Sequence, residues 1–182
     1  QEYNSKGEID NKFPIIFCSF FTQGESRRIA RVPLSIMALT EANAVYSEVF
    51  LTQKKLAAMK DEERFIERNF LESKYKKLIY NKELTVYTVA AHIVANNLHI
   101  SDIFIAYEYA SLLSRLCLNL PDQYFDGVNI PKDTEDFGEN NRTMLKIRDR
   151  GYLFFILSFW APQINTTSDP VDWLEKTLHN SG

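Results

Sequence analysis

Apolar residues recur at helical spacing from Leu34 to Leu178. In most segments they return every three or four positions, and this spacing places them on one face of an α-helix. The pattern predicts helices over about residues 33–50, 52–80, 84–97, 101–120 and 141–160, with a short one after Asp169 and Pro170. We therefore expect an all-α, single-domain bundle of six or seven helices in which helix exceeds about half of the residues, against a usual third.

The N-terminal part of the chain lacks this periodicity. Residues 1–12 are polar, and we expect a flexible segment there, followed by a single helical domain over residues 13–182. Residues 13–21, FPIIFCSFF, are rich in aromatic and β-branched side chains, which favours a minor extended segment packed on the core. Ser26 is of a type that caps helices, so a short helical turn is expected after it. That turn would contain Arg27, Arg28 and Arg31.

The distribution of apolar residues also predicts which helices are central. The segments 84–97 and 101–120 are apolar on more than one face, which is typical of helices at the centre of a bundle. The residues predicted to be almost fully buried are Ile93, Leu112, Leu116, Phe155 and Trp160. The apolar face of the segment that ends at Tyr80 would consist of Phe65, Ile66, Phe70, Leu71, Leu78 and Ile79.

Composition narrows the classes of function. The 182 residues include only 6 Gly and 6 Pro, too few for the many turns of an all-β barrel or sandwich. The net charge of −3 gives no reason to expect a nucleic acid or an anionic membrane surface as partner. The longest apolar run, residues 152–160, is much shorter than the about 20 residues of a membrane span. The start at Gln1 instead of Met slightly favours an exported protein.

Motifs for catalysis and metal binding are missing from the sequence. There is no GxSxG nucleophile elbow, no glycine-rich phosphate loop and no HExxH pair. An EF-hand alignment from Asp133 puts Gly138 at the required sixth position but Met144 where a bidentate carboxylate is needed. Cys18 and Cys117 lack zinc-site spacing, and they form either a disulfide or two free thiols. We expect no metal and no cofactor, and the sequence leans against an enzyme without deciding the question, because sites assembled from distant residues leave no motif.

One long break interrupts the helical pattern, at residues 121–140. It concentrates carboxylates and places aromatic residues among them, a combination that suits steering and then anchoring of a basic protein partner. The residues of this hypothetical partner surface are Asp122, Tyr124, Phe125, Asp133, Glu135, Asp136 and Phe137. The alternative is a solvated connector whose aromatic residues pack on the chain's own core.

A basic cluster follows this loop. Arg142, Lys146 and Arg150 are spaced four apart, so on one continuous helix they would share a face. Such a face can hold a phosphate or an acidic partner. It can equally form ordinary surface ion pairs with the acidic loop.

Three functions remain compatible with these patterns. The favoured one is a non-catalytic protein-binding module, such as an adaptor, an inhibitor or an immunity-type protein, that uses the acidic aromatic loop. The alternative is a small helical enzyme or small-ligand-binding protein with a pocket lined by Tyr107, Tyr109 and neighbouring aromatic residues. A helical DNA-binding regulator comes third, because Pro33 interrupts the place where a basic recognition helix would continue. The oligomeric state is left open.

Overall fold

The computed structural model describes residues 14–21, 27–164 and 169–182. Helix makes up 71% of the structure, so the predicted all-α bundle is confirmed. The α-helices are α1 (Ile36–Ala57), α2 (Asp61–Ile79), α3 (Thr85–Asn97), α4 (Ile103–Asn119), α5 (Glu139–Lys146), α6 (Arg150–Trp160) and α7 (Pro170–Ser181). Two short 3-10 helices, η1 (Asp122–Asp126) and η2 (Lys132–Phe137), connect α4 to α5. None of the helices described has the length and apolar character needed to cross a bilayer.

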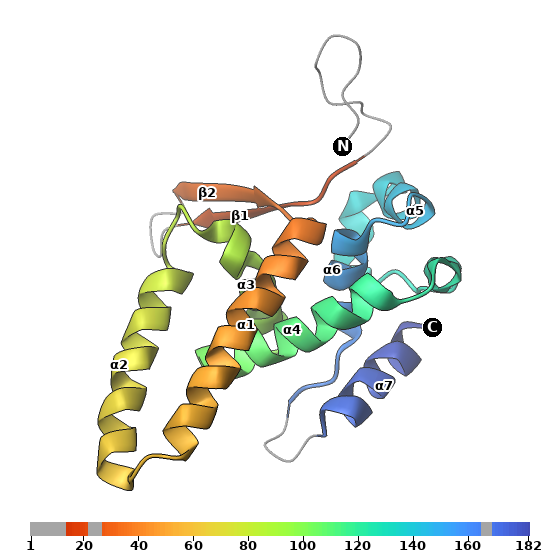
Figure 1. Ribbon diagram of the computed structural model, residues 1–182. Coiled ribbons are helices and arrows are strands. Elements are labelled where there is room, and N and C mark those ends of the chain that lie inside the picture. The colour runs from red at the N-terminus through yellow and green to blue at the C-terminus, as the bar shows by residue number, and fades with distance from the viewer. Residues whose placement is uncertain (1–13, 22–26, 165–168) are drawn as a thin grey trace.

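A β-hairpin covers one end of the bundle (Figure 1). Strand β1 (Phe17–Phe21) pairs antiparallel with β2 (Arg28–Pro33), with Cys18 opposite Val32. The predicted extended segment is therefore confirmed, whereas the helical turn expected at Arg28 and Arg31 is wrong. Capping preferences are local and do not reveal the strand partner, which lies 7 to 16 residues earlier in the chain and supplies the hydrogen bonds of β2.

Helices α1 and α2 form an antiparallel pair in which α2 lies at the outer edge of the domain (Figure 1). Helix α1 begins after its N-cap Ser35 and continues through Thr52, so the break expected at residues 50–52 is wrong. Helix α2 begins at Asp61, later than the predicted start at residue 52, and its first turn holds the carboxylates of Asp61, Glu62 and Glu63, which suit a helix N-terminus. Arg64 joins the two helices, because its guanidinium donates hydrogen bonds to the carbonyl oxygens of Leu56 at 3.0 Å and Met59 at 2.8 Å.

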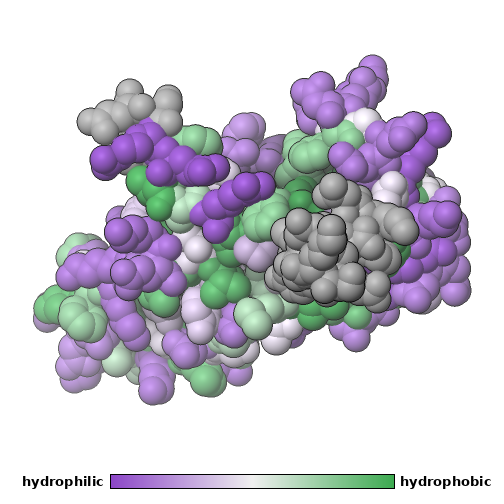
Figure 2. Space-filling view, turned by 90° about the horizontal axis from the view of Figure 1, so that it is seen from above, coloured by the Kyte–Doolittle hydropathy of each residue, from purple (hydrophilic) through white to green (hydrophobic). Residues whose placement is uncertain are grey.

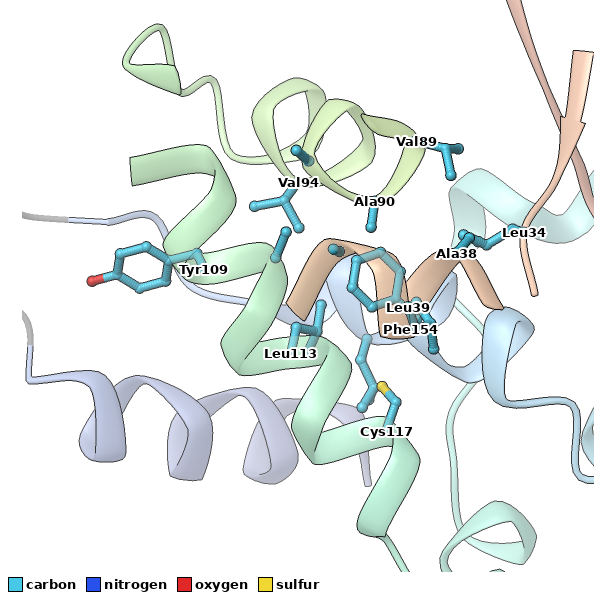
Figure 3. Close-up of a cluster of buried hydrophobic side chains, with 14 of the residues drawn as sticks. Leu34, Ala38, Leu39, Val89, Ala90, Val94, Tyr109, Leu113, Cys117 and Phe154 are labelled. Carbon is cyan, nitrogen blue, oxygen red and sulfur yellow. The ribbon is translucent and has the colours of Figure 1, made fainter. Parts of the chain in front are cut away.

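The core is built around α4, which contacts α1, α3, α6 and α7. Small buried residues allow its neighbours to approach closely, namely Ala106, Ala110, Ser111 and Ser114. Figure 3 shows Leu113 and Cys117 of α4 beside Leu39 of α1 and Phe154 of α6, all fully buried. Cys117 is thus a core residue, and both cysteines are free thiols.

The five residues predicted to be almost fully buried are only half-buried. In α4, Leu113 and Cys117 are fully buried, and each lies one residue beyond a predicted position, Leu112 or Leu116. One position turns a side chain by about 100° around a helix axis. The small residues determine which face of α4 meets its neighbours, and the large leucines then lie on its flanks.

The helix expected over residues 141–160 is two helices, α5 and α6. Arg148 has a positive φ of 59°, and Asp149 caps α6 by accepting a hydrogen bond from the Tyr152 amide at 2.7 Å. Close packing holds α6 in this place, because a Cβ on Gly151 would lie 2.2 Å from the Leu34 carbonyl oxygen. The contact between Gly151 and the chain before α1 is long-range, so helical periodicity alone could not predict it.

Candidate binding surfaces

Two carboxylates of the acidic segment, residues 121–140, form ion pairs with arginines of the same chain. Arg148 binds Asp126 with both guanidinium nitrogens, at 2.7 and 3.0 Å, and this hydrogen bonding lowers the pKa of Asp126. Arg150 pairs with Asp122 and also donates to the carbonyl oxygens of Cys117 and Leu120. The arginine thereby satisfies carbonyls at the end of α4, which would otherwise lack a partner.

The aromatic residues of this segment also face inwards. Phe125 is 1% exposed, and the guanidinium carbon of Arg150 lies 4.9 Å from its ring centroid. The Tyr124 hydroxyl lies 2.5 Å from the Ser181 hydroxyl of α7. Phe137 packs edge-to-face on Phe155, with ring centroids 5.9 Å apart. These contacts match the alternative of a connector pinned to its own core, and they leave Phe125 unable to anchor a partner.

The remaining carboxylates of the segment do reach solvent. Asp133, Glu135 and Asp136 on η2 are exposed, and within the described chain none of them has an ion pair. Asn141 fixes the backbone beneath them by donating to the Thr134 carbonyl at 2.8 Å. No group of three or more metal-ligating side chains occurs in the parts of the chain that the structure describes.

The predicted basic cluster is divided between two helices. Arg142 and Lys146 are exposed on α5, whereas Arg150 lies on α6 and points to Asp122. Because the chain turns at Arg148, these three side chains do not share one helix face. Arg142 instead lines a hollow of about 460 Å³ together with Glu135 and Glu139.

The two tyrosines named for the small-ligand alternative pack inside the domain. Tyr107 is fully buried, and Tyr109 packs edge-to-face on Trp173 with ring centroids 4.8 Å apart. A hollow of about 390 Å³ does lie between α1, α2 and α4, over Leu56 and Phe104. Its charged groups have partners within the chain, because Arg64 donates to the Leu56 and Met59 carbonyls and Arg68 lies 3.6 Å from Asp102.

Helix α2 carries a surface that the sequence pattern misassigned. Of its six predicted core residues, Leu71, Leu78 and Ile79 pack against the core, but Phe65, Ile66 and Phe70 are 69%, 69% and 64% exposed. Hydrophobic side chains accordingly reach the surface along the edge of the molecule where α2 lies (Figure 2). The spacing shows two apolar faces, since Ile66 and Phe70 lie on the opposite side of the helix from the buried Tyr75, but it does not show which face turns inwards.

We call this exposed strip the α2 outer face. It consists of Glu62, Ile66, Asn69, Phe70, Ser73 and Lys77, with Phe65 at its margin. Two other exposed aromatic rings have a cation or a second ring as neighbour: Phe50 of α1 lies 4.5 Å from the Lys54 ammonium, and the ring centroid of Tyr80 lies 6.2 Å from that of His92. No covering cation or ring contact is found for Phe65 or Phe70 within the described residues.

Comparisons with known proteins give no match: no family model, no curated protein and no solved structure is significantly similar to this chain.

Proposed function

We propose that this chain is a non-catalytic protein-binding domain and that the α2 outer face is its main binding surface. The observation that carries the proposal is the exposure of Phe65, Ile66 and Phe70 on a single helix. Burying one such side chain contributes about 1.5–3 kcal/mol, so a protein that covers all three gains a substantial apolar contact. Large aromatic residues within a polar rim are also the usual anchors of protein interfaces.

The helix does not need these side chains for its own attachment. Tyr75 is buried against α4, with its ring centroid 5.6 Å from that of Phe104, and Leu71, Leu78 and Ile79 pack on the core beside it. The outer face is therefore free to contact a partner while the inner face holds α2 on the domain. An exposed apolar patch of this kind is typical of an interaction site.

The exposed carboxylates of η2 are a second candidate surface. Asp133, Glu135 and Asp136 could steer a basic protein towards the domain, since charges that lack internal partners act at longer range. The aromatic residues near them pack within the domain, so this surface offers charged side chains but no exposed aromatic side chain to anchor a partner. It supports the same class of function with a weaker contact.

Site-specific photo-crosslinking tests the proposed function. A benzophenone side chain is placed at Ser73 on the outer face, and the control chain carries it at the exposed Glu175 of α7. On irradiation in the cells that produce the protein, we expect crosslinks to a protein from position 73 and few from position 175. Equal crosslinking from both positions, or none from position 73, contradicts the proposal.

A further inference from the structure

Resting on the proposed use of the α2 outer face, we infer that its partner is a second copy of this chain, bound through α2 in antiparallel orientation. The inference comes from the order of charges along the helix. The first turn holds Asp61, Glu62 and Glu63, and the last turn holds Lys76 and Lys77. Ile66 and Phe70 lie between these two charged ends.

Antiparallel pairing places opposite charges together at both ends. If the two-fold axis passes between Asn69 and Phe70, then Glu62 and Glu63 of each copy lie across from Lys77 and Lys76 of the other. Glu62, Glu63, Lys76 and Lys77 are exposed and have no ion pair within the described residues. Parallel pairing would instead bring carboxylate against carboxylate and ammonium against ammonium.

The same axis brings the apolar residues of the two copies together. The two Phe70 rings meet beside the axis, and Ile66 lies one turn away on the same face, where it opposes the small Ser73 of the second copy. The two Phe70 rings thus form the apolar centre of the contact, each Ile66 packs over a small residue, and charged residues lie at both margins. A self-complementary patch of this form is what a two-fold symmetric interface requires.

The size of the contact predicts a weak, reversible dimer. Helix α2 has 19 residues and is about 28 Å long at 1.5 Å per residue. One helix pair of this length falls at the small end of specific interfaces, so we expect a dissociation constant of about 1–100 µM.

Sedimentation equilibrium of the purified full chain tests the inference. The wild-type chain should form a dimer as its concentration rises to about 300 µM, above the expected dissociation constant. Phe70→Glu should weaken the dimer at least about tenfold, because it places a charge at the apolar centre. The matched control is Val171→Glu on α7, which is 63% exposed, and it should leave dimerisation unchanged. A wild-type chain that stays monomeric overturns the inference, as does equal weakening by both variants.

Charge reversal gives a sharper result. Glu62→Lys with Glu63→Lys makes α2 basic at both ends, and Lys76→Glu with Lys77→Glu makes it acidic at both ends. Each double variant should dimerise poorly alone, whereas an equimolar mixture should form a heterodimer, because the two helices then complement each other. Circular dichroism checks that both are folded. If folded variants fail to pair when mixed, the charge-ordered arrangement is wrong.

Cysteine crosslinking reports the orientation. In the antiparallel pair, position 69 lies beside the axis, so Asn69→Cys should form an intermolecular disulfide on mild oxidation. The two thiols of Lys76→Cys are about 20 Å apart along the helix, so this variant should form no such disulfide. Disulfides at both positions would indicate parallel pairing and contradict the inference. The native thiols do not interfere, because Cys117 is buried and burial raises the pKa of Cys18 to about 11.

Failure of this inference can be told apart from failure of the proposed function. Photo-crosslinks from position 73 to a protein of another mass, together with a monomeric purified chain, would keep the binding domain and exclude self-association. Crosslinks to the chain itself, together with sedimentation as a dimer, support both.

Discussion

Helices α2 and α4 are similar in length, 19 and 17 residues, and both carry several aromatic side chains, yet they occupy opposite environments. Helix α4 is buried over most of its length, whereas Tyr75 is the only buried residue of α2. The difference lies in the residues between the aromatic ones. Helix α4 has Ala106, Ala110 and Ser114 where its neighbours cross it, and α2 has charged residues around its circumference. Small residues, more than aromatic ones, thus mark the helix at the centre.

The largest expected change in stability comes from truncating a large apolar side chain in α4, and the same kind of truncation in α2 should have little effect. Leu113→Ala in α4 should lower the free energy of unfolding by about 2–5 kcal/mol, because it leaves a cavity in a fully packed core. Phe70→Ala in α2 should change it by less than about 0.5 kcal/mol in dilute solution, where the side chain contacts mainly water. Urea unfolding curves measure both, and equal losses would show that α2 belongs to the core.

Replacing the arginines that bind backbone carbonyls near the ends of the two helices should also cost different amounts of stability. Arg150→Gln removes the hydrogen bonds to the Cys117 and Leu120 carbonyls and the pairing with Asp122, so we expect a loss of about 1.5–3 kcal/mol. Arg64→Gln at the start of α2 removes a more exposed set of bonds and should cost no more than about 1 kcal/mol. Thermal unfolding of the two variants compares them directly, and a reversed order would contradict the view that α4 is the more firmly fixed helix.

The junction between α2 and α3 should respond to pH. A ring nitrogen of His92 lies 2.9 Å from the Ile79 carbonyl oxygen, and burial lowers the pKa of the imidazole. Between the ordinary pKa of about 6.5 and the lowered one, the unfolded chain binds a proton that the folded chain does not. The contribution of the neutral His92 to the free energy of unfolding should therefore be fully present above about pH 6.5 and should decrease as the pH falls below it.

His92→Gln is the variant that isolates this effect. It should flatten the dependence of the melting temperature on pH between about 5 and 7 relative to the wild-type chain. The surface histidine His179 provides the matched control, and His179→Gln should keep the wild-type dependence. An unchanged slope in the His92 variant would assign the response to other groups.

The smallest effect on stability is expected from the exposed acidic residues. Replacing Asp133, Glu135 and Asp136 by Asn, Gln and Asn should leave the free energy of unfolding within about 0.5 kcal/mol of the wild-type value. If the η2 carboxylates steer a basic protein, the triple variant should associate with it more slowly and with a flatter dependence on salt. Stopped-flow association at several salt concentrations measures this, and unchanged kinetics would reduce η2 to a solvated connector.

Much of the helical framework could be predicted from sequence because its signals are local. The apolar spacing over residues 84–97 indicated α3, and Asp169 with Pro170 indicated the start of α7. Long-range packing escaped the same reasoning: the pairing of β2 with β1, the contact of Gly151 with Leu34, and the one-residue shift of the buried face of α4. Each depends on a segment distant in the chain, which periodicity does not show.

The candidate surfaces were less predictable than the fold. A break rich in carboxylates and aromatic residues suggested a partner site, but Arg148 and Arg150 lie close enough to pair two of its carboxylates and cover Phe125. The α2 outer face went unnoticed because Ile66 and Phe70 have the spacing of a buried stripe. Only the position of Tyr75 relative to α4 shows which of the two apolar faces of α2 turns inwards.

The exposure of Phe70 compared with Phe154 tests the central claim most directly. Hydroxyl-radical footprinting followed by mass spectrometry measures both rings in the same sample of dilute wild-type chain. The α2 outer face predicts rapid oxidation of Phe70, which is 64% exposed, and strong protection of Phe154, which is fully buried. At high concentration or with a bound partner, Phe70 should become protected as well. Equal protection of the two rings in dilute solution would show that the α2 outer face is covered by its own domain and would contradict the account.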